Sequence, residues 1–180
     1  MQLATSRLVL REFVEDDWRW VHAVETPDVV RYMTQDPATP ESARAYIERV
    51  QRLAAEDPRR IFDFAVVRAA EPERVIGRSG MGLEAHHNAQ VWFLLDPQHR
   101  AQGYATEATR AVIDFAFDRL GVHRVYGDCD PRNTASAQLM ERLGMRREAH
   151  HVENWFLKGE WCDSWIYAVL DREWAARPTS

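Results

Sequence analysis

The chain has 180 residues, 46% of them hydrophobic and 28% charged, which is the composition of a globular protein with a substantial core. Its formal net charge of −5 and its lack of a basic stripe argue against tight binding to nucleic acid. Two cysteines are too few for a disulfide framework or a cysteine zinc site, and neither a membrane-length apolar run nor a signal-peptide core is present. We therefore expect one cytoplasmic domain over residues 1–180, without a metal ion.

The first third of the chain predicts a strand followed by two helices. Alternating apolar residues indicate a strand over residues 8–14, and residues 16–25 carry apolar side chains at helical spacing. Pro27 breaks this helix. A second helix begins at Thr39-Pro40, because threonine caps a helix and proline fits its first turn, and it ends at Asp57-Pro58.

The middle of the chain predicts three strands. Two strand-like runs, residues 61–67 and 74–83, flank a turn at residues 71–73. Three glycines, at positions 77, 80 and 82, predict that the second run is twisted or bulged. A third strand over residues 91–95 is closed by Asp96-Pro97.

The last part predicts a strand, two helices and a hairpin. In chain order these are a helix over residues 106–120, a strand over 122–129, a helix over 132–143 and a hairpin of residues 152–157 and 161–170. The whole order predicts one α+β domain with a mixed sheet. In that sheet the strands on either side of the 106–120 helix should be parallel and joined by a right-handed crossover.

The segment from Arg100 to Ala105 lies between a strand and a helix and contains Gly103. The first N–H groups of a helix have no partner in the helix, and the helix dipole adds positive potential there. Gly103 would let the main chain approach an anion closely, which predicts a site for a phosphate-like group. An ordinary strand-to-helix turn is the alternative. The glycine spacing matches neither the dinucleotide fingerprint nor the P-loop.

Three motifs together resemble a known family. They are Arg100-x-x-Gly103-x-Ala105, then Asn133-x-x-Ser136, then Leu143-Gly144-Met145. This combination is similar to the coenzyme-binding motifs of the GNAT superfamily of acyl-CoA-dependent N-acetyltransferases. The segments 6–13 and 159–163 resemble the branch that contains the ribosomal-protein alanine/serine N-terminal acetyltransferases.

The resemblance implies a mostly antiparallel central sheet, flanked by helices, in which two parallel strands splay apart and the pantetheine arm of acetyl-CoA lies between them. It implies that an N–H near Leu94 polarises the thioester carbonyl. Backbone groups of the first splayed strand would pair with pantetheine, and the loop would hold the diphosphate. The residues so implied are Phe93, Leu94, Leu95, Arg100, Ala101, Gln102, Gly103, Tyr104, Ala105 and Thr106.

The resemblance also implies roles for two polar residues in the second motif. Asn133 matches an asparagine that contacts pantetheine, and it is equally suited to cap the helix that follows. Ser136 matches a serine that gives a proton to the departing thiolate, although a serine in a first helical turn is also ordinary. A tyrosine acid common in the family is replaced by Met140, which cannot donate a proton.

The general base is the least defined part of the predicted site. A glutamate common in this branch is replaced by Gln90, which cannot act as a base. Asp128 is the remaining carboxylate at a suitable position, since strand alternation directs it to the same face as Tyr126. A solvated strand-end carboxylate and a water-mediated base are the alternatives. Weaker candidates are Glu84, His86 and His87.

The predicted activity is direct transfer of an acetyl group from acetyl-CoA to a primary amine, either a protein N-terminus or a small molecule. The lack of a strong base favours an α-amine, which is partly neutral at pH 7. One alternative is a degenerate acyl-CoA sensor or docking module. Another is a ribosome-associated protein, which the net negative charge of the chain argues against. The tryptophan content is explained by core filling, and the alternative is that some of Trp92, Trp155, Trp161 and Trp165 line a substrate mouth or a homodimer contact.

Overall fold

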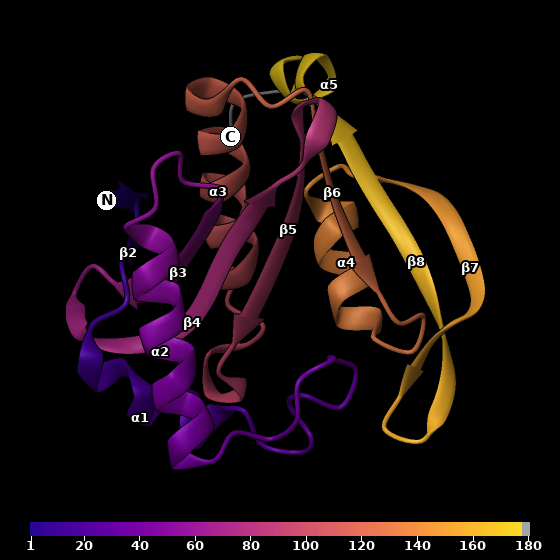
Figure 1. Ribbon diagram of the computed structural model, residues 1–180. Coiled ribbons are helices and arrows are strands. Elements are labelled where there is room, and N and C mark those ends of the chain that lie inside the picture. The colour runs from indigo at the N-terminus through magenta and orange to yellow at the C-terminus, as the bar shows by residue number, and fades with distance from the viewer. Residues whose placement is uncertain (178–180) are drawn as a thin grey trace.

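An eight-stranded sheet forms the centre of the computed structural model, which describes residues 1–177 (Figure 1). The strand order is β1-β2-β3-β4-β5-β6-β8-β7. The strands are β1 (Gln2–Ala4), β2 (Leu8–Arg11), β3 (Ile61–Arg68), β4 (Glu71–Leu83), β5 (Asn88–Leu95), β6 (Arg124–Cys129), β7 (Arg146–Leu157) and β8 (Glu160–Leu170). The helices are α1 (Trp18–Val24), α2 (Pro40–Ala54), α3 (Tyr104–Leu120), α4 (Thr134–Arg142) and α5 (Asp171–Ala175).

The helices cover both faces of the sheet and divide the core in two. The apolar stripe of α3, with Val112 and Ile113, packs together with α4 against one face. The stripe of α2, with Ile47 and Val50, packs with α1 against the other face. Burying each such side chain contributes roughly 1.5–3 kcal/mol. No helix within residues 1–177 combines the length and apolar character needed to cross a bilayer.

The expected α+β fold and the expected parallel pair are both confirmed. β5 and β6, on either side of α3, run parallel, whereas the other neighbouring strands of the described sheet are antiparallel. Their pairing runs only from Asn88 opposite Arg124 to Gln90 opposite Tyr126. Beyond that point both strands continue, β5 to Leu95 and β6 to Cys129, without pairing to each other. The sheet therefore opens into a wedge between the two strands.

Helix ends follow the predicted capping chemistry. Thr39 caps α2, and its Oγ1 accepts a hydrogen bond from the Ser42 N–H at 3.2 Å. α3 ends at Gly121 in the left-handed conformation, with φ of 63°. It begins at Tyr104, two residues before the predicted start, because Gly103 at φ 81° already directs the chain into the helix.

The structure corrects several predicted boundaries. The strand expected at 91–95 begins at Asn88, and the hairpin strand expected at 152 begins at Arg146. The turn expected at residues 71–73 falls at residues 69–70. β1 and α5 had no counterpart in the predicted order.

The bulge predicted for β4 is confirmed next to Gly77, whereas Gly80 and Gly82 act differently. The irregular register lies where Val66 pairs with Gly77 and Val67 with Val75, whereas Gly80 and Gly82 pair regularly. A Cβ on Gly80 would lie 2.4 Å from the Phe62 oxygen and 2.8 Å from the Trp92 indole nitrogen. This glycine therefore makes room for the Trp92 side chain at the wedge.

Candidate functional site

The wedge between β5 and β6 contains a cavity with about 820 Å³ of open space, which we call the wedge cavity. It brings together Asp128, Asn133 and Ser136, three residues that the sequence singled out. The remaining walls come from β5, from the end of β6, from α4, from the loop between α1 and α2 and from the β7–β8 hairpin. They are residues 32–34, 90–93, 127 and 129–130, Met140, Trp155, Leu157 and residues 162–164.

Alternate residues of β5 direct their backbone N–H and C=O groups into the wedge. The Asp96 N–H donates to the Ile76 carbonyl at 2.9 Å, and the Glu84 N–H donates to the Asn88 carbonyl at 2.8 Å. The register between these two bonds is regular, so the even-numbered residues of β5 bond to β4. The N–H and C=O groups of Phe93 and Leu95 therefore face the wedge. Those of Leu94 bond within the β4–β5 ladder, so an N–H near Leu94 that faces the wedge belongs to Phe93 or Leu95.

The loop before α3 presents a run of free N–H groups. Among the hydrogen bonds formed within residues 1–177, none uses the N–H of residues 101–106 as its donor. Two left-handed residues, Ala101 at φ 59° and Gly103 at φ 81°, shape this loop. Asp96 fixes its beginning, because Asp96 Oδ1 accepts the Gln98 N–H at 2.9 Å. Adjacent free N–H groups at the N-terminus of a 17-residue helix are suited to bind a phosphate-like anion.

Asn133 caps α4 and lines the wedge cavity at the same time. Its Oδ1 accepts the Ser136 N–H at 3.2 Å, which leaves its amide nitrogen as a donor. Ser136 lies in the first turn of α4, half-buried, and its hydroxyl has no hydrogen-bond partner among residues 1–177. The hydroxyl is therefore free to bond with a molecule in the cavity.

Asp128 lies at the wedge with its carboxylate held by the opposite strand. Gln90 Nε2 donates to Asp128 Oδ1 at 2.7 Å, immediately beyond the last parallel pair. Asp128 is exposed, so its carboxylate retains contact with water. The Tyr126 hydroxyl donates to Glu84 at 2.8 Å, and burial together with this bond raises the pKa of Tyr126 to about 12. At neutral pH Tyr126 is therefore protonated.

Two sulfur-containing side chains, Met140 and Cys129, line the inner wall of the cavity. Met140 is fully buried, and its Sδ lies 3.1 Å from where a Cβ on Gly127 would stand. The Cys129 thiol is buried beside carboxylates, and burial is the main cause that raises its pKa to about 12. Neither side chain supplies a ready proton or a thiolate at neutral pH.

The outer wall depends on contacts between segments that are far apart in the sequence. Lys158, the only lysine of the chain, lies in the turn of the β7–β8 hairpin and donates to the carbonyls of Val30 and Met33, the latter at 3.0 Å. Arg132 stacks on the Tyr32 ring and pairs with Glu160 at 2.9 Å. These contacts join the α1–α2 loop to the hairpin.

A buried carboxylate anchors Arg132 in this wall. Asp130 receives hydrogen bonds from the Arg132 N–H at 2.8 Å and from its guanidinium at 2.6 Å. Burial opposes ionisation of Asp130, but the bonds from Arg132 outweigh it and hold the pKa of Asp130 below its usual value. The Arg132 guanidinium also donates to Cys162 Sγ at 3.2 Å, which ties the start of α4 to β8.

Sequence reasoning missed most of this outer wall. No periodic pattern marked the segment at residues 32–34, whose position depends on Lys158. The tryptophan content was a partial signal. Trp92 and Trp155 line the cavity, whereas Trp161 is 60% exposed on the hairpin, against Phe156. His86 and His87 lie in an exposed turn and do not contribute to the cavity.

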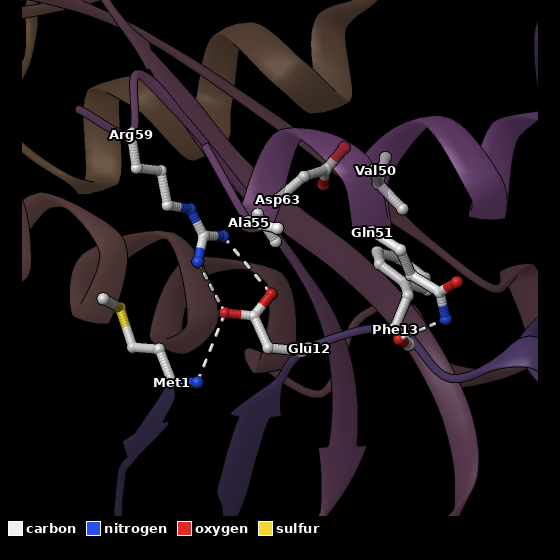
Figure 2. A pocket seen from close by; sticks show the side chains of 9 residues that line it. Met1, Glu12, Phe13, Val50, Gln51, Ala55, Arg59 and Asp63 are labelled. Atoms are coloured by element: carbon white, nitrogen blue, oxygen red, sulfur yellow. Dashed lines mark hydrogen bonds and ion pairs between the residues drawn. The ribbon is translucent and has the colours of Figure 1, made fainter. Parts of the chain in front are cut away.

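A second cavity lies between α2 and the β2–β3 part of the sheet (Figure 2). Its charged groups pair with one another, since the Glu12 carboxylate lies 2.7 Å from Arg59 and 3.4 Å from the Met1 amine. Asp63 accepts a hydrogen bond from Tyr46 at 2.7 Å. None of the residues that the sequence singled out lines this cavity, so the wedge cavity is the candidate site. Within residues 1–177 no three His, Cys, Asp or Glu side chains are grouped as metal ligands.

Comparison with known proteins gives a consistent result. A family model described as Acetyltransferase (GNAT) domain matches residues 7–146. The chain is 30% identical to the uncharacterized N-acetyltransferase YnaD of Bacillus subtilis (strain 168), over 97% of this chain and 99% of that protein. It is 25% identical to the spermidine N(1)-acetyltransferase of Vibrio cholerae serotype O1, over 96% of this chain and 98% of that protein.

Solved structures have the same fold. An acetyltransferase (GNAT family) from Bacillus anthracis superposes with a TM-score of 0.85 at 28% identity, covering 96% of this chain and all of that one. The spermidine N-acetyltransferase from Vibrio cholerae in complex with CoA and spermine has a TM-score of 0.82 at 22% identity, covering 95% and 99%, which supports the fold alone. Because a spermidine acetyltransferase is among these proteins, the comparisons do not single out the ribosomal-protein branch.

Proposed function

The chain belongs to the GNAT family of N-acetyltransferases, which use acetyl-CoA, and we propose that it transfers the acetyl group directly to a primary amine held in the wedge cavity. The observation that carries the proposal is the wedge itself. The free N–H groups of residues 101–106 belong to the segment that follows β5, the first strand of the wedge, and the cavity itself is lined by the α1–α2 loop and the hairpin. A coenzyme held at the loop and an amine held in the cavity would then meet between the two strands.

The chain's own groups fit the coenzyme. The diphosphate would lie on the N–H groups of residues 101–106, with Arg100 beside them, since this loop offers donors without internal partners. Backbone groups of Phe93 and Leu95 and the Asn133 amide would bind the pantetheine arm. Bound there, the coenzyme would supply the acetyl group as a thioester. The N–H of Phe93 or Leu95 would hydrogen-bond its carbonyl oxygen.

Asp128 is the proposed general base. Its carboxylate faces the wedge cavity, and Gln90 holds one oxygen at 2.7 Å, while the other has no partner within residues 1–177. In this arrangement Gln90 orients the carboxylate that accepts the amine proton, directly or through a water molecule. A carboxylate exposed to solvent can then release that proton to bulk water.

Ser136 is the proposed proton donor to the departing thiolate. The serine is held by the first turn of α4, which Asn133 caps, and its hydroxyl has no partner within residues 1–177. The tyrosine position of the family is filled by buried Met140, so the hydroxyl of Ser136 is the protein's own donor at this wall.

The proposed acceptor is an α-amine or another small primary amine. About 10–20% of an α-amine is neutral at pH 7, against about one part in 2,500 of a lysine amine. A single exposed carboxylate is a weak base, so the site suits the amine that is already partly neutral. Carboxylates of Asp128 and Asp163 on the cavity wall attract the protonated form of such an acceptor.

A second candidate is a coenzyme-binding sensor without turnover. The specific observation that favours it is that Met140 and Gln90 occupy the places where the family commonly has an acid and a base. In that case coenzyme A binds to the wedge, and no amine is acetylated.

The experiment that separates the two measures thiol release from acetyl-CoA over a panel of amines that contains N-terminal peptides and polyamines. The enzyme hypothesis predicts turnover with at least one amine. It also predicts that Ser136→Ala combined with Asp128→Asn lowers the rate by about 100-fold or more, with coenzyme affinity changed less than threefold. Tight coenzyme binding without turnover on any amine would instead establish the sensor.

A further inference from the structure

Arg7, in the turn between β1 and β2, joins the N-terminal segment to the coenzyme loop. Its Nη1 donates to the Gln102 carbonyl at 3.0 Å, and its guanidinium stacks on the Tyr104 ring at 4.6 Å. Its Nε donates to Glu107 Oε2 at 2.7 Å, in the first turn of α3. One side chain therefore contacts three successive parts of the loop and helix start.

The contact with Gln102 fixes the orientation of one peptide group. In a planar trans peptide, the carbonyl of residue 102 and the N–H of Gly103 point in opposite directions. Because Arg7 holds that carbonyl, the Gly103 N–H is directed away from Arg7. A Cβ on Gly103 would lie 3.3 Å from Arg7 Nη2, so the guanidinium also packs against this residue.

Glu107 holds Arg7 in place and balances its charge. The same carboxylate accepts the Arg7 N–H at 3.1 Å and the Thr5 hydroxyl at 2.5 Å. Burial of Glu107 opposes ionisation, but the hydrogen bonds from Thr5 and Arg7 outweigh it, so the pKa of Glu107 lies below its usual value. Since the carboxylate is ionised at neutral pH, the pair adds little net charge near the loop.

We propose that Arg7 is a positioning residue for coenzyme binding, which acts through the Gln102 carbonyl to aim the Gly103 N–H at the diphosphate. The inference rests on the proposed function, because it assumes that the diphosphate lies on this loop. It adds a role for the N-terminal segment, which lies more than ninety residues before the loop in sequence. It also predicts that the role of Arg7 depends on the diphosphate and is independent of the terminal 3′-phosphate.

The test compares the wild-type chain with Arg7→Met, Arg7→Lys and Arg19→Met. Calorimetry measures the Kd for coenzyme A and for dephospho-coenzyme A, and thiol release measures turnover of S-acetylpantetheine, which lacks the diphosphate. Arg19 is a matched control, because it is 62% exposed on α1, where it pairs with Asp16 and stacks on the Trp18 ring. Its substitution removes the same charge without touching the loop.

The expected results differ between ligands. Arg7→Met raises the Kd for coenzyme A and for dephospho-coenzyme A by about tenfold each, in line with the loss of a charged hydrogen bond. Its turnover of S-acetylpantetheine stays within twofold of wild type, which also shows that the variant is folded. Arg7→Lys recovers at least half of the lost affinity on a logarithmic scale, because its ammonium can reach the same carbonyl. Arg19→Met binds as wild type does.

Three outcomes would overturn the positioning role. One is an unchanged Kd in Arg7→Met, and another is an equal loss with S-acetylpantetheine, which would indicate a general structural role. The third is a loss confined to ligands with the 3′-phosphate, which would indicate direct contact with that group. A wild-type chain that binds no coenzyme A at all would overturn the proposed function itself and this inference with it.

Discussion

The proposed coenzyme loop and the proposed acceptor side of the wedge cavity are built in different ways. The loop is one short segment, residues 100–106, in which the main chain supplies the donors and Gly103 supplies the shape. The acceptor side is assembled from three separate segments whose side chains meet, with Lys158 and Arg132 joining them. The first is a local turn with one long-range contact, from Arg7 to Gln102, whereas the second exists only once the whole sheet is in place.

This difference predicts how each part responds to change. Main-chain donors cannot be removed by substitution, so the coenzyme loop is altered mainly through the backbone conformation of Gly103. Partly exposed contacts such as that of Lys158 contribute little to stability. We therefore expect changes on the acceptor side to affect amine selectivity and to leave coenzyme affinity intact.

The largest expected effect is that of Gly103→Val on coenzyme affinity. A β-branched residue at φ 81° costs at least about 2 kcal/mol, so either the loop changes shape or binding must restore it, and the Kd for coenzyme A rises roughly 30-fold. Calorimetry measures this Kd.

The matched control for this variant is Gly121→Val at the opposite end of the same helix. Gly121 has φ of 63°, and no heavy atom lies within 4 Å of where a Cβ on this residue would stand. A valine at position 121 would therefore carry a backbone strain similar to that of a valine at position 103. The melting temperature of Gly121→Val should fall by a few degrees, as in Gly103→Val. Its coenzyme affinity should stay within twofold. Equal loss of affinity in both variants would show that helix stability, and not loop shape, controls binding.

The proposed coenzyme loop was also the part whose local structure could be predicted from sequence. Gly103 before an amphipathic helix, together with Asn133 and Ser136, indicated a loop and a helix start, and both positions depend on local chemistry. The sequence could not decide whether Leu94 or its neighbours direct their N–H groups into the wedge, because the direction alternates at every residue of a strand. The strand start was predicted three residues late, and the alternation is fixed by the bonds from Asp96 to Ile76 and from Glu84 to Asn88.

The acceptor side could not be predicted for a different reason. The first half of β7, from Arg146 to His151, has no apolar face, so no periodic pattern revealed it. The position of Met33 in the cavity wall is fixed by Lys158, from a hairpin more than a hundred residues later. Contacts of this kind arise from tertiary packing and leave no local signal.

An intermediate effect is expected for Lys158→Met on the amine. Loss of the bonds to the Val30 and Met33 carbonyls frees the α1–α2 loop, so the KM for the amine should rise about fivefold. This corresponds to about 1 kcal/mol, the typical net contribution of a hydrogen bond. The Kd for coenzyme A should not change. Steady-state kinetics with the best amine of the panel measures the first and calorimetry the second.

Lys158→Arg is the control, because a guanidinium can donate to the same two carbonyls. It should keep the KM for the amine within twofold of wild type. If Lys158→Met weakened coenzyme binding as strongly as amine binding, the coenzyme loop and the acceptor side would not be independent of each other.

The smallest expected effect is that of the Glu107 carboxylate on the melting temperature in acid. The pKa of Glu107 is lower in the folded chain than its ordinary value of 4.5, so its ionised form stabilises the fold above that value. The stabilisation is lost as the pH falls from 4.5 through the lowered pKa. Glu107→Gln keeps an oxygen for Thr5 and Arg7 but does not titrate. Between pH 7 and pH 4 the melting temperature of wild type should therefore fall by a degree or so more than that of Glu107→Gln, roughly as expected for a fraction of 1 kcal/mol.

Glu173→Gln separates this local effect from general acid destabilisation. Glu173 also has a lowered pKa, chiefly through the Leu170 N–H, but it lies in α5 and pairs with Arg146, away from the loop. Both substitutions should reduce the acid-dependent part of the melting temperature. Only Glu107→Gln should also change the pH dependence of the Kd for coenzyme A, because only Glu107 holds Arg7 against the Gln102 carbonyl. Identical pH profiles of the Kd in the two variants would show that the Glu107–Arg7 pair stabilises the fold without shaping the coenzyme loop.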